Sequence, residues 1–146
     1  MFVTMKTKML IKNQNGGAAV EFALILPLFI FLIFGIVEGS LFLYNQQIIT
    51  NASREGARAG IVAKTPTRVS DADIEVVVDK YADKYLVTFG NQNFPPPTIT
   101  PVEPRSGNLF GTDLTVDISF NYDFLVLSAF GFGPINLRAQ TIMKME

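Results

Sequence analysis

An apolar run near the amino terminus, Ala18–Tyr44, constrains this chain more than any other feature of its sequence. The run holds 21 apolar residues in 27. Its uncharged part, Phe22–Val37, has 16 residues, which is about 24 Å of helix at about 1.5 Å per residue. Extension to Tyr44 gives 23 residues, about 34 Å of helix, against a hydrocarbon core of about 30 Å. The sequence therefore predicts a retained transmembrane helix over Gly17–Tyr44.

The segment before the run, Met1–Gly16, is basic, with Lys6, Lys8 and Lys12 and no acidic residue. A basic start followed by an apolar stretch is also the order of a secretory signal. Here, however, the small residues precede the apolar stretch, which is longer than a signal core of about 7–15 residues. Because basic residues stay on the cytoplasmic side, we expect a cytoplasmic amino terminus with the remaining chain outside.

Composition narrows the chemistry. The 146 residues carry 12 Lys and Arg against 13 Asp and Glu, so no basic excess favours nucleic-acid binding. The chain has no Cys and no His, which excludes disulfides, thiolate zinc sites and thiol catalysis and removes the commonest general base. We expect a non-enzymatic protein without metal or cofactor. An anchored enzyme that uses carboxylates alone is the remaining catalytic alternative.

Two acidic residues, Glu21 and Glu38, interrupt the apolar run. A charge inside a bilayer is costly and usually has a partner. If a peptidase cut the chain after Gly16, the new amine of Gly17 in a neighbouring copy could pair with Glu21. For Glu38 two readings stay open: a position at the headgroups where the apolar core ends, or a paired position.

The segment Gly16-Gly17-Ala18-Ala19-Val20-Glu21-Phe22 looks like a prepilin cleavage site, with glycine before the cut and glutamate at the fifth position after it. Further motifs follow as GIVE at 35–38, YNQQ at 44–47 and ASREGAR at 52–58. Together they resemble the TadE/TadG-like family, the minor pilins of the Flp (tight adherence) pilus. Gly39-Ser40 departs from this pattern, since relatives often carry a bulkier residue there.

This resemblance implies a minor pilin or pseudopilin of a type IV pilus, cut between Gly16 and Gly17 by a prepilin peptidase. Its partners would be that peptidase, other Flp pilus subunits, the inner-membrane platform and the membrane, with no nucleic acid. The implied location is the bacterial inner membrane, as a single-pass protein, or the pilus. Subunit packing is expected at Glu21, Phe22, Pro27 and Glu38. Pro27 would mark either a simple kink or a place where the helix melts on assembly. The alternative function is an unprocessed, membrane-anchored scaffold or ligand-binding protein.

Beyond the membrane we expect a helical stem over Asn45–Ala63 that ends before Pro66. Gly56 and Gly60 in the stem either allow close packing or only weaken the helix. A capping box at Ser70 opens a second helix over about Asp71–Val87. Acidic residues on this helix form a solvated face rather than a cation site: Asp71, Asp73, Glu75, Asp79 and Asp83.

After the prolines that precede Thr98, the apolar pattern changes to alternation, which is typical of strands. Thr98–Val102 is expected as an edge strand, Ser106–Asn108 as a turn, and Leu114–Tyr122 and Ile135–Met143 as strands of a three-stranded antiparallel sheet. The fold class is thus α+β and pilin-like. The predicted divisions are a leader at 1–16, a transmembrane helix at 17–44, a stem at 45–63 and an exported α+β domain at 64–146.

The segment Phe124–Pro134 is strongly apolar for a connection between strands. Exposed apolar patches often mark contact surfaces. One hypothesis is that Phe130 and Phe132 contact a partner subunit or the bilayer surface. The alternative is that the segment folds back and caps a small core.

Overall fold

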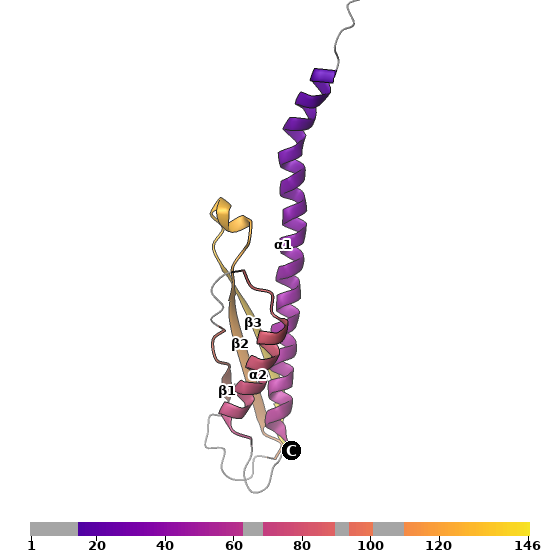
Figure 1. Cartoon of the computed structure of the whole chain (residues 1–146). Helices are drawn as coiled ribbons and strands as arrows, with labels where there is room; N and C mark the ends of the chain where they lie inside the picture. The colour runs from indigo at the N-terminus through magenta and orange to yellow at the C-terminus, as the bar shows by residue number, and fades with distance from the viewer. Residues whose placement is uncertain (1–14, 63–68, 90–93, 101–109) are drawn as a thin grey trace, which may run out of the picture. The chain divides into compact units, whose positions relative to one another are not determined.

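The computed structural model describes residues 15–62, 69–89, 94–100 and 110–146 (Figure 1). The chain divides into two units, Met1–Gly35 and Ile36–Glu146. Several predicted features lie outside the described residues: the lysines of the leader, the break at Pro66, the last two residues of the edge strand predicted over Thr98–Val102, and the turn at 106–108. The second unit begins at Ile36, ahead of the predicted membrane boundary at Tyr44. The four-part division of the chain remains a prediction.

The first long element, α1, spans Asn15–Ile61 and continues through Pro27. It is the helix, within the described residues, that is long and apolar enough to cross a membrane. Its most apolar window buries none of its residues inside the protein. An apolar helix is stable in lipid because its backbone N–H and C=O groups form hydrogen bonds within the helix. The exposure of this helix therefore fits a membrane anchor.

The second helix, α2, spans Asp71–Tyr85 and begins with the predicted capping box. The Ser70 hydroxyl accepts a hydrogen bond from the Asp73 N–H at 3.1 Å, and the Asp73 carboxylate accepts one from the Ser70 N–H at 3.4 Å. The helix ends before the predicted Val87. The backbone of Val87 bonds to the Asn45 side chain instead of continuing the helix.

The sheet contains β1 (Thr98–Thr100), β2 (Asp113–Tyr122) and β3 (Ile135–Lys144), in the order β1-β2-β3 with antiparallel pairing. The β2–β3 register runs from Asp113 opposite Lys144 to Tyr122 opposite Ile135. Alternate residues of β2 are buried, as predicted, and the α+β fold class is confirmed.

The core of the second unit lies between one face of this sheet and the two helices. Its members come from α1, α2 and all three strands, and the central ones are Ile49, Ala52, Ile74, Val78, Ile99, Leu114, Val116, Ile118, Phe120 and Leu137. The last part of α1 is therefore a component of the folded domain, as well as the stem that follows the membrane segment.

Two glycines of α1 allow the close approach that packs this core. A Cβ on Gly56 would lie 2.5 Å from Cγ2 of Val78. One on Gly60 would lie 2.5 Å from Cδ2 of Leu114 and 2.6 Å from Cδ1 of Ile74. Of the two alternatives drawn from the sequence, the structure supports close packing.

Candidate functional site

The predicted processing site lies in the first turn of α1. Gly16 and Gly17 are helical and exposed, and a Cβ added at either would meet nothing within 4 Å. Both peptide groups are therefore open to another protein. Cleavage between Gly16 and Gly17 stays a prediction.

The predicted packing residues of the first unit are all on the surface. Phe22 is 64% exposed, and Glu21 and Pro27 are exposed as well. Within the described part of the chain, Glu21 makes no hydrogen bond or ion pair. The structure thus presents these side chains outward, and their role in subunit packing stays a prediction.

Glu38 lies in a different environment from Glu21, because it belongs to the second unit and is only 2% exposed. Its Oε1 accepts a hydrogen bond from the Val126 N–H, and its Oε2 accepts one from the Leu127 N–H, both at 3.1 Å. Leu127 opens η1, a short 3-10 helix over Leu127–Phe130. The first N–H groups of a helix have no internal acceptor, so the carboxylate satisfies two donors that would otherwise be unbonded.

Among the described residues, Glu38 is therefore paired with backbone groups and not with a cation. From the sequence two readings of Glu38 were open, a headgroup position and a paired position, and nothing in the sequence pointed to these backbone partners. Its predicted part in subunit packing stays untested.

Tyr122, the last residue of β2, lies near enough to the Glu38 carboxylate to be affected by its charge. It is 1% exposed, and its hydroxyl oxygen has no hydrogen-bond partner among the described residues. Its ring packs edge-on against Phe42 of α1 at 6.1 Å between centroids and against Phe124 at 5.5 Å. Burial raises the pKa of Tyr122 above its ordinary value, and the negative charge of Glu38 raises it further. The sequence predicted Tyr122 as the last residue of a strand but did not predict its proximity to Glu38.

The segment 124–134, which we call the apolar loop, combines a packed base with an exposed tip. Phe124 packs on the core, whereas Leu125 is 51%, Phe130 64% and Phe132 56% exposed. Gly131 closes η1 with a φ of 87°, a left-handed conformation that favours glycine. The loop therefore caps the core only through its first residue, and its later aromatic side chains face outward.

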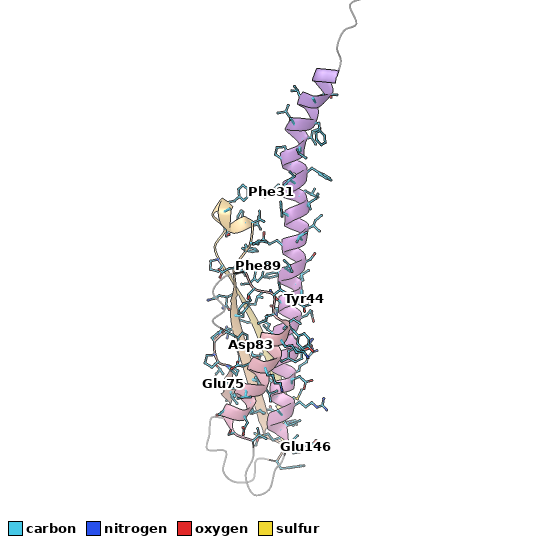
Figure 2. All side chains as sticks on the ribbon, in the orientation of Figure 1. Phe31, Tyr44, Glu75, Asp83, Phe89 and Glu146 are labelled. Carbon is cyan, nitrogen blue, oxygen red and sulfur yellow. The ribbon has the colours of Figure 1, made fainter. Side chains whose placement is uncertain are left out.

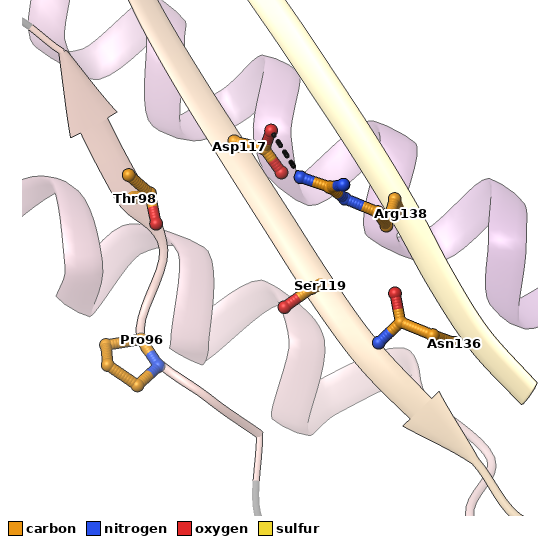
Figure 3. Close-up of a pocket in the computed structure, with 6 residues that line it drawn as sticks. All are labelled: Pro96, Thr98, Asp117, Ser119, Asn136 and Arg138. Carbon is orange, nitrogen blue, oxygen red and sulfur yellow. Dashed lines mark hydrogen bonds and ion pairs between the residues drawn. The ribbon is translucent and has the colours of Figure 1, made fainter. Parts of the chain in front are cut away.

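A polar hollow of about 300 Å³ lies on the other face of the sheet, crossing all three strands. Figure 3 shows the side chains of Asp117 and Arg138 meeting within it, with an N–O distance of 3.3 Å. Gln140 also donates to the Asp117 carboxylate, at 3.4 Å. The Asp117 carboxylate is thus already paired with a cation and hydrogen-bonded. This arrangement suits a surface that binds polar groups better than a site for general acid–base catalysis.

Asp79, on the acidic face of α2, has a perturbed carboxyl group. Burial raises the pKa of Asp79, and the charges of Glu75 and Asp83 raise it further. Figure 2 shows Glu75 and Asp83 on this helix. Across the described ranges, no cluster of three or more acidic side chains could hold a metal ion.

Comparison with known protein families gives a match to a part of α1. The family model TadE, described as TadE-like protein, matches residues 16–58. Over those residues, this match confirms the resemblance that the quoted motifs predicted. No curated protein and no solved structure matches the chain.

Proposed function

We propose that this chain, TadE-like over residues 16–58, is a non-enzymatic minor pilin or pseudopilin that takes part in assembly of a Flp type IV pilus. The observation that carries the proposal is an exposed apolar helix that begins at Gly16-Gly17 and has Glu21 near its start. Such a helix needs lipid or other apolar helices around it, since water would have to cover its side chains at a high free-energy cost.

The exposure of Gly16 and Gly17 supports cleavage of the chain between them. A prepilin peptidase would cut between Gly16 and Gly17 on the cytoplasmic side of the inner membrane, removing the basic leader. The cut frees an amine on Gly17, close in sequence to the carboxylate of Glu21. Two groups of opposite charge in lipid attract more strongly than in water, because the dielectric constant is lower.

Assembly follows from that charge pair. Within one helix the amine and the carboxylate of Glu21 are near each other, but the amine of an adjoining subunit can satisfy the same carboxylate and set the stagger between helices. A buried charge without a partner is strongly destabilising. Subunits in the wrong register would leave Glu21 unpaired, so the pair selects one arrangement. Phe22 and Pro27 lie on the same exposed segment and would contact neighbouring subunits or the inner-membrane platform.

A second candidate is an anchored ligand-binding or scaffold protein that keeps its leader. The polar hollow around Asp117 and Arg138 favours it, because that surface offers charged and amide groups away from the core. This alternative requires neither cleavage nor a partner for Glu21.

The intact mass of the chain purified from its native membrane distinguishes the two. The pilin proposal expects a chain that begins at Gly17. A matched variant, Gly16→Phe, should keep its full length, and it has room for the larger side chain because nothing lies within 4 Å of a Cβ there. A wild-type chain that begins at Met1 in cells containing the peptidase would contradict the proposal and support the anchored scaffold.

A further inference from the structure

The apolar loop lies at the end of the second unit where the chain enters it. The unit begins at Ile36, and Glu38, just inside it, holds the N–H groups of Val126 and Leu127. These bonds fix the start of η1 beside the first turn of α1 that belongs to this unit. The position of the loop therefore follows from two hydrogen bonds within one folded body.

Backbone hydrogen bonds also define the opposite end of the second unit. There the N–H of Glu146 donates to the carbonyl oxygen of Ile61, the last residue of α1, at 3.3 Å. The N–H of Gly111 donates to the carbonyl oxygen of Met145 at 2.9 Å. Phe110, which is 74% exposed, precedes this contact and so lies at the far end of β2 from the apolar loop.

The connection between the two units determines which end of the second unit directly follows the apolar stretch. The uncharged apolar stretch, residues 22–37, ends immediately before Glu38. If that stretch crosses the hydrocarbon, Glu38 lies at the lipid–water boundary, and so do the residues that it binds. The apolar loop, which Glu38 holds, is then close to that boundary, whereas Phe110 lies at the other end of β2.

The chemistry of the loop suits that position. Residues 124–134 contain no charged side chain, and Leu125, Phe130 and Phe132 are each more than half exposed. Exposed Phe and Leu on a membrane-facing surface are typical of segments that lie in the bilayer interface. The left-handed Gly131 and the bonds to Glu38 fix the backbone beforehand, so little conformational entropy is lost when the side chains enter lipid.

We infer that the apolar loop is a second membrane contact, which inserts Phe130 and Phe132 into the outer interface of the bilayer that holds α1. The inference rests on the anchoring part of the proposed function. The occupant is lipid rather than protein because the bonds to Glu38 tie the loop to the residue that directly follows the uncharged apolar stretch, and the loop carries no charge to select a partner. The folded domain would then be held against the membrane until the subunit is extracted.

The absence of Trp from the sequence gives a direct test, since one introduced Trp is the only indole in the protein. Full-length Phe130→Trp is reconstituted in phosphatidylcholine vesicles whose acyl chains carry bromine at a chosen depth. Interfacial segments bury their apolar face about 5–10 Å into the headgroup–acyl boundary. We therefore expect a blue-shifted emission and a loss of fluorescence that is greatest with the shallowest bromines. Phe132→Trp is the second probe.

Two reference variants separate the possible failures. Phe29→Trp, in the apolar stretch, should be quenched most by deep bromines, and Phe110→Trp should not be quenched. If Phe29→Trp is quenched while both loop probes behave like Phe110→Trp, the membrane contact is overturned and anchoring stands. If Phe29→Trp is not quenched, anchoring fails and the loop contact fails with it.

Two further measurements vary the charge of the lipid and the protein-to-lipid ratio of the vesicles. Because the loop has no charged residue, replacing part of the phosphatidylcholine by phosphatidylglycerol should leave the quenching unchanged, and a requirement for anionic lipid would contradict the inference. A blue shift that appears without bromine quenching and grows with the protein-to-lipid ratio would also overturn it, in favour of contact with a second copy of the chain.

Discussion

Asn45 of α1 binds both backbone groups of Val87, the residue that follows the C-cap of α2. Its Nδ2 donates to the Val87 carbonyl oxygen at 2.7 Å, and its Oδ1 accepts from the Val87 N–H at 3.0 Å. Asn45 is fully buried. The side-chain amide thus takes the place that a neighbouring strand would have, and it joins the two helices where α2 ends.

Replacing Asn45 by Asp should destabilise the second unit. The substitution keeps the shape but removes the donor and sets a carboxylate oxygen against a carbonyl oxygen. Leaving a buried polar group unsatisfied costs about 1–3 kcal/mol, and thermal unfolding of the full-length chain in detergent would measure the loss. Gln47→Glu, at an exposed position on the same helix, is the control and should change the free energy of unfolding by less than about 0.5 kcal/mol. Equal effects of the two variants would contradict this account.

Alanine at Gly60 should also destabilise, although alanine favours a helix by about 1 kcal/mol over glycine. Its Cβ would meet Leu114 and Ile74 at 2.5–2.6 Å. Overpacking of this kind costs about 1–3 kcal/mol, which exceeds the gain in helix propensity. Gly39→Ala is the matched control, because nothing lies within 4 Å of its Cβ. If the unfolding midpoint falls for both Gly60→Ala and Gly39→Ala, or for neither, close packing is not the role of Gly60.

The raised pKa of Tyr122 predicts that the folded state loses stability at alkaline pH. Its pKa is raised above 10.0 by burial and by Glu38, so the folded state keeps the phenol proton at a pH where the unfolded state releases it. Stability therefore falls as the pH rises above the ordinary tyrosine value. Tyr122→Phe should remove that part of the alkaline loss and cost little at neutral pH, since the hydroxyl has no hydrogen-bond partner among the described residues.

Glu38→Gln should lower the pKa of Tyr122 without restoring its ordinary value, because burial is the larger cause. Absorbance titration of tyrosinate, with Tyr122→Phe as the subtraction control, would follow this change. An unchanged Tyr122 titration in Glu38→Gln would mean that the carboxylate does not act on the phenol.

Removal of the Glu38 side chain should release the apolar loop. Glu38→Ala leaves the Val126 and Leu127 N–H groups without their acceptor, at about 1–3 kcal/mol for each unsatisfied donor. Hydrogen exchange at these two amides should become faster while exchange in β2 stays slow. Glu55→Ala, at an exposed position of α1, should leave all of these rates unchanged. Slow exchange at both loop amides in Glu38→Ala would show that other contacts hold the loop.

Glu21→Ala tests the assembly step of the proposed function. The variant should insert into the membrane normally, because a charge has been removed from an apolar helix, and should still be cut after Gly16. Pilus assembly should fall sharply, measured as surface pilus protein relative to membrane-bound subunit. Glu21→Asp, which keeps a shortened carboxylate, should recover part of the assembly. Normal piliation with Glu21→Ala would remove this residue from the mechanism.

The sequence predicted the elements whose signals are local. The Ser70–Asp73 box needs only residues three apart, and the alternation of β2 reports a strand with one buried face, so both predictions agree with the structure. Helix α2 ends at Tyr85 rather than Val87 because Asn45, 42 positions away in sequence, binds the Val87 backbone. A local pattern carries no information about a partner at that distance.

Glu38 shows the same limit more strongly, because its partners are 88 and 89 residues away. The sequence identified Glu38 as a charge at the end of an apolar run and the apolar loop as a candidate contact, but nothing connected the two. Only the antiparallel return of the chain through β2 brings the loop back to the first turns of the folded domain.

The antiparallel pairing of β2 with β3 also sets an order of events during synthesis. β3 is made after every other described element, and it pairs with β2 over the whole length from Asp113 to Tyr122. Until then, the edge of β2 that pairs with β3 has no neighbouring strand, and unpaired strand edges are prone to aggregate. The domain can therefore complete its sheet only after α1 has long been synthesised, so the apolar helix has time to enter the membrane before the domain attached to it is folded.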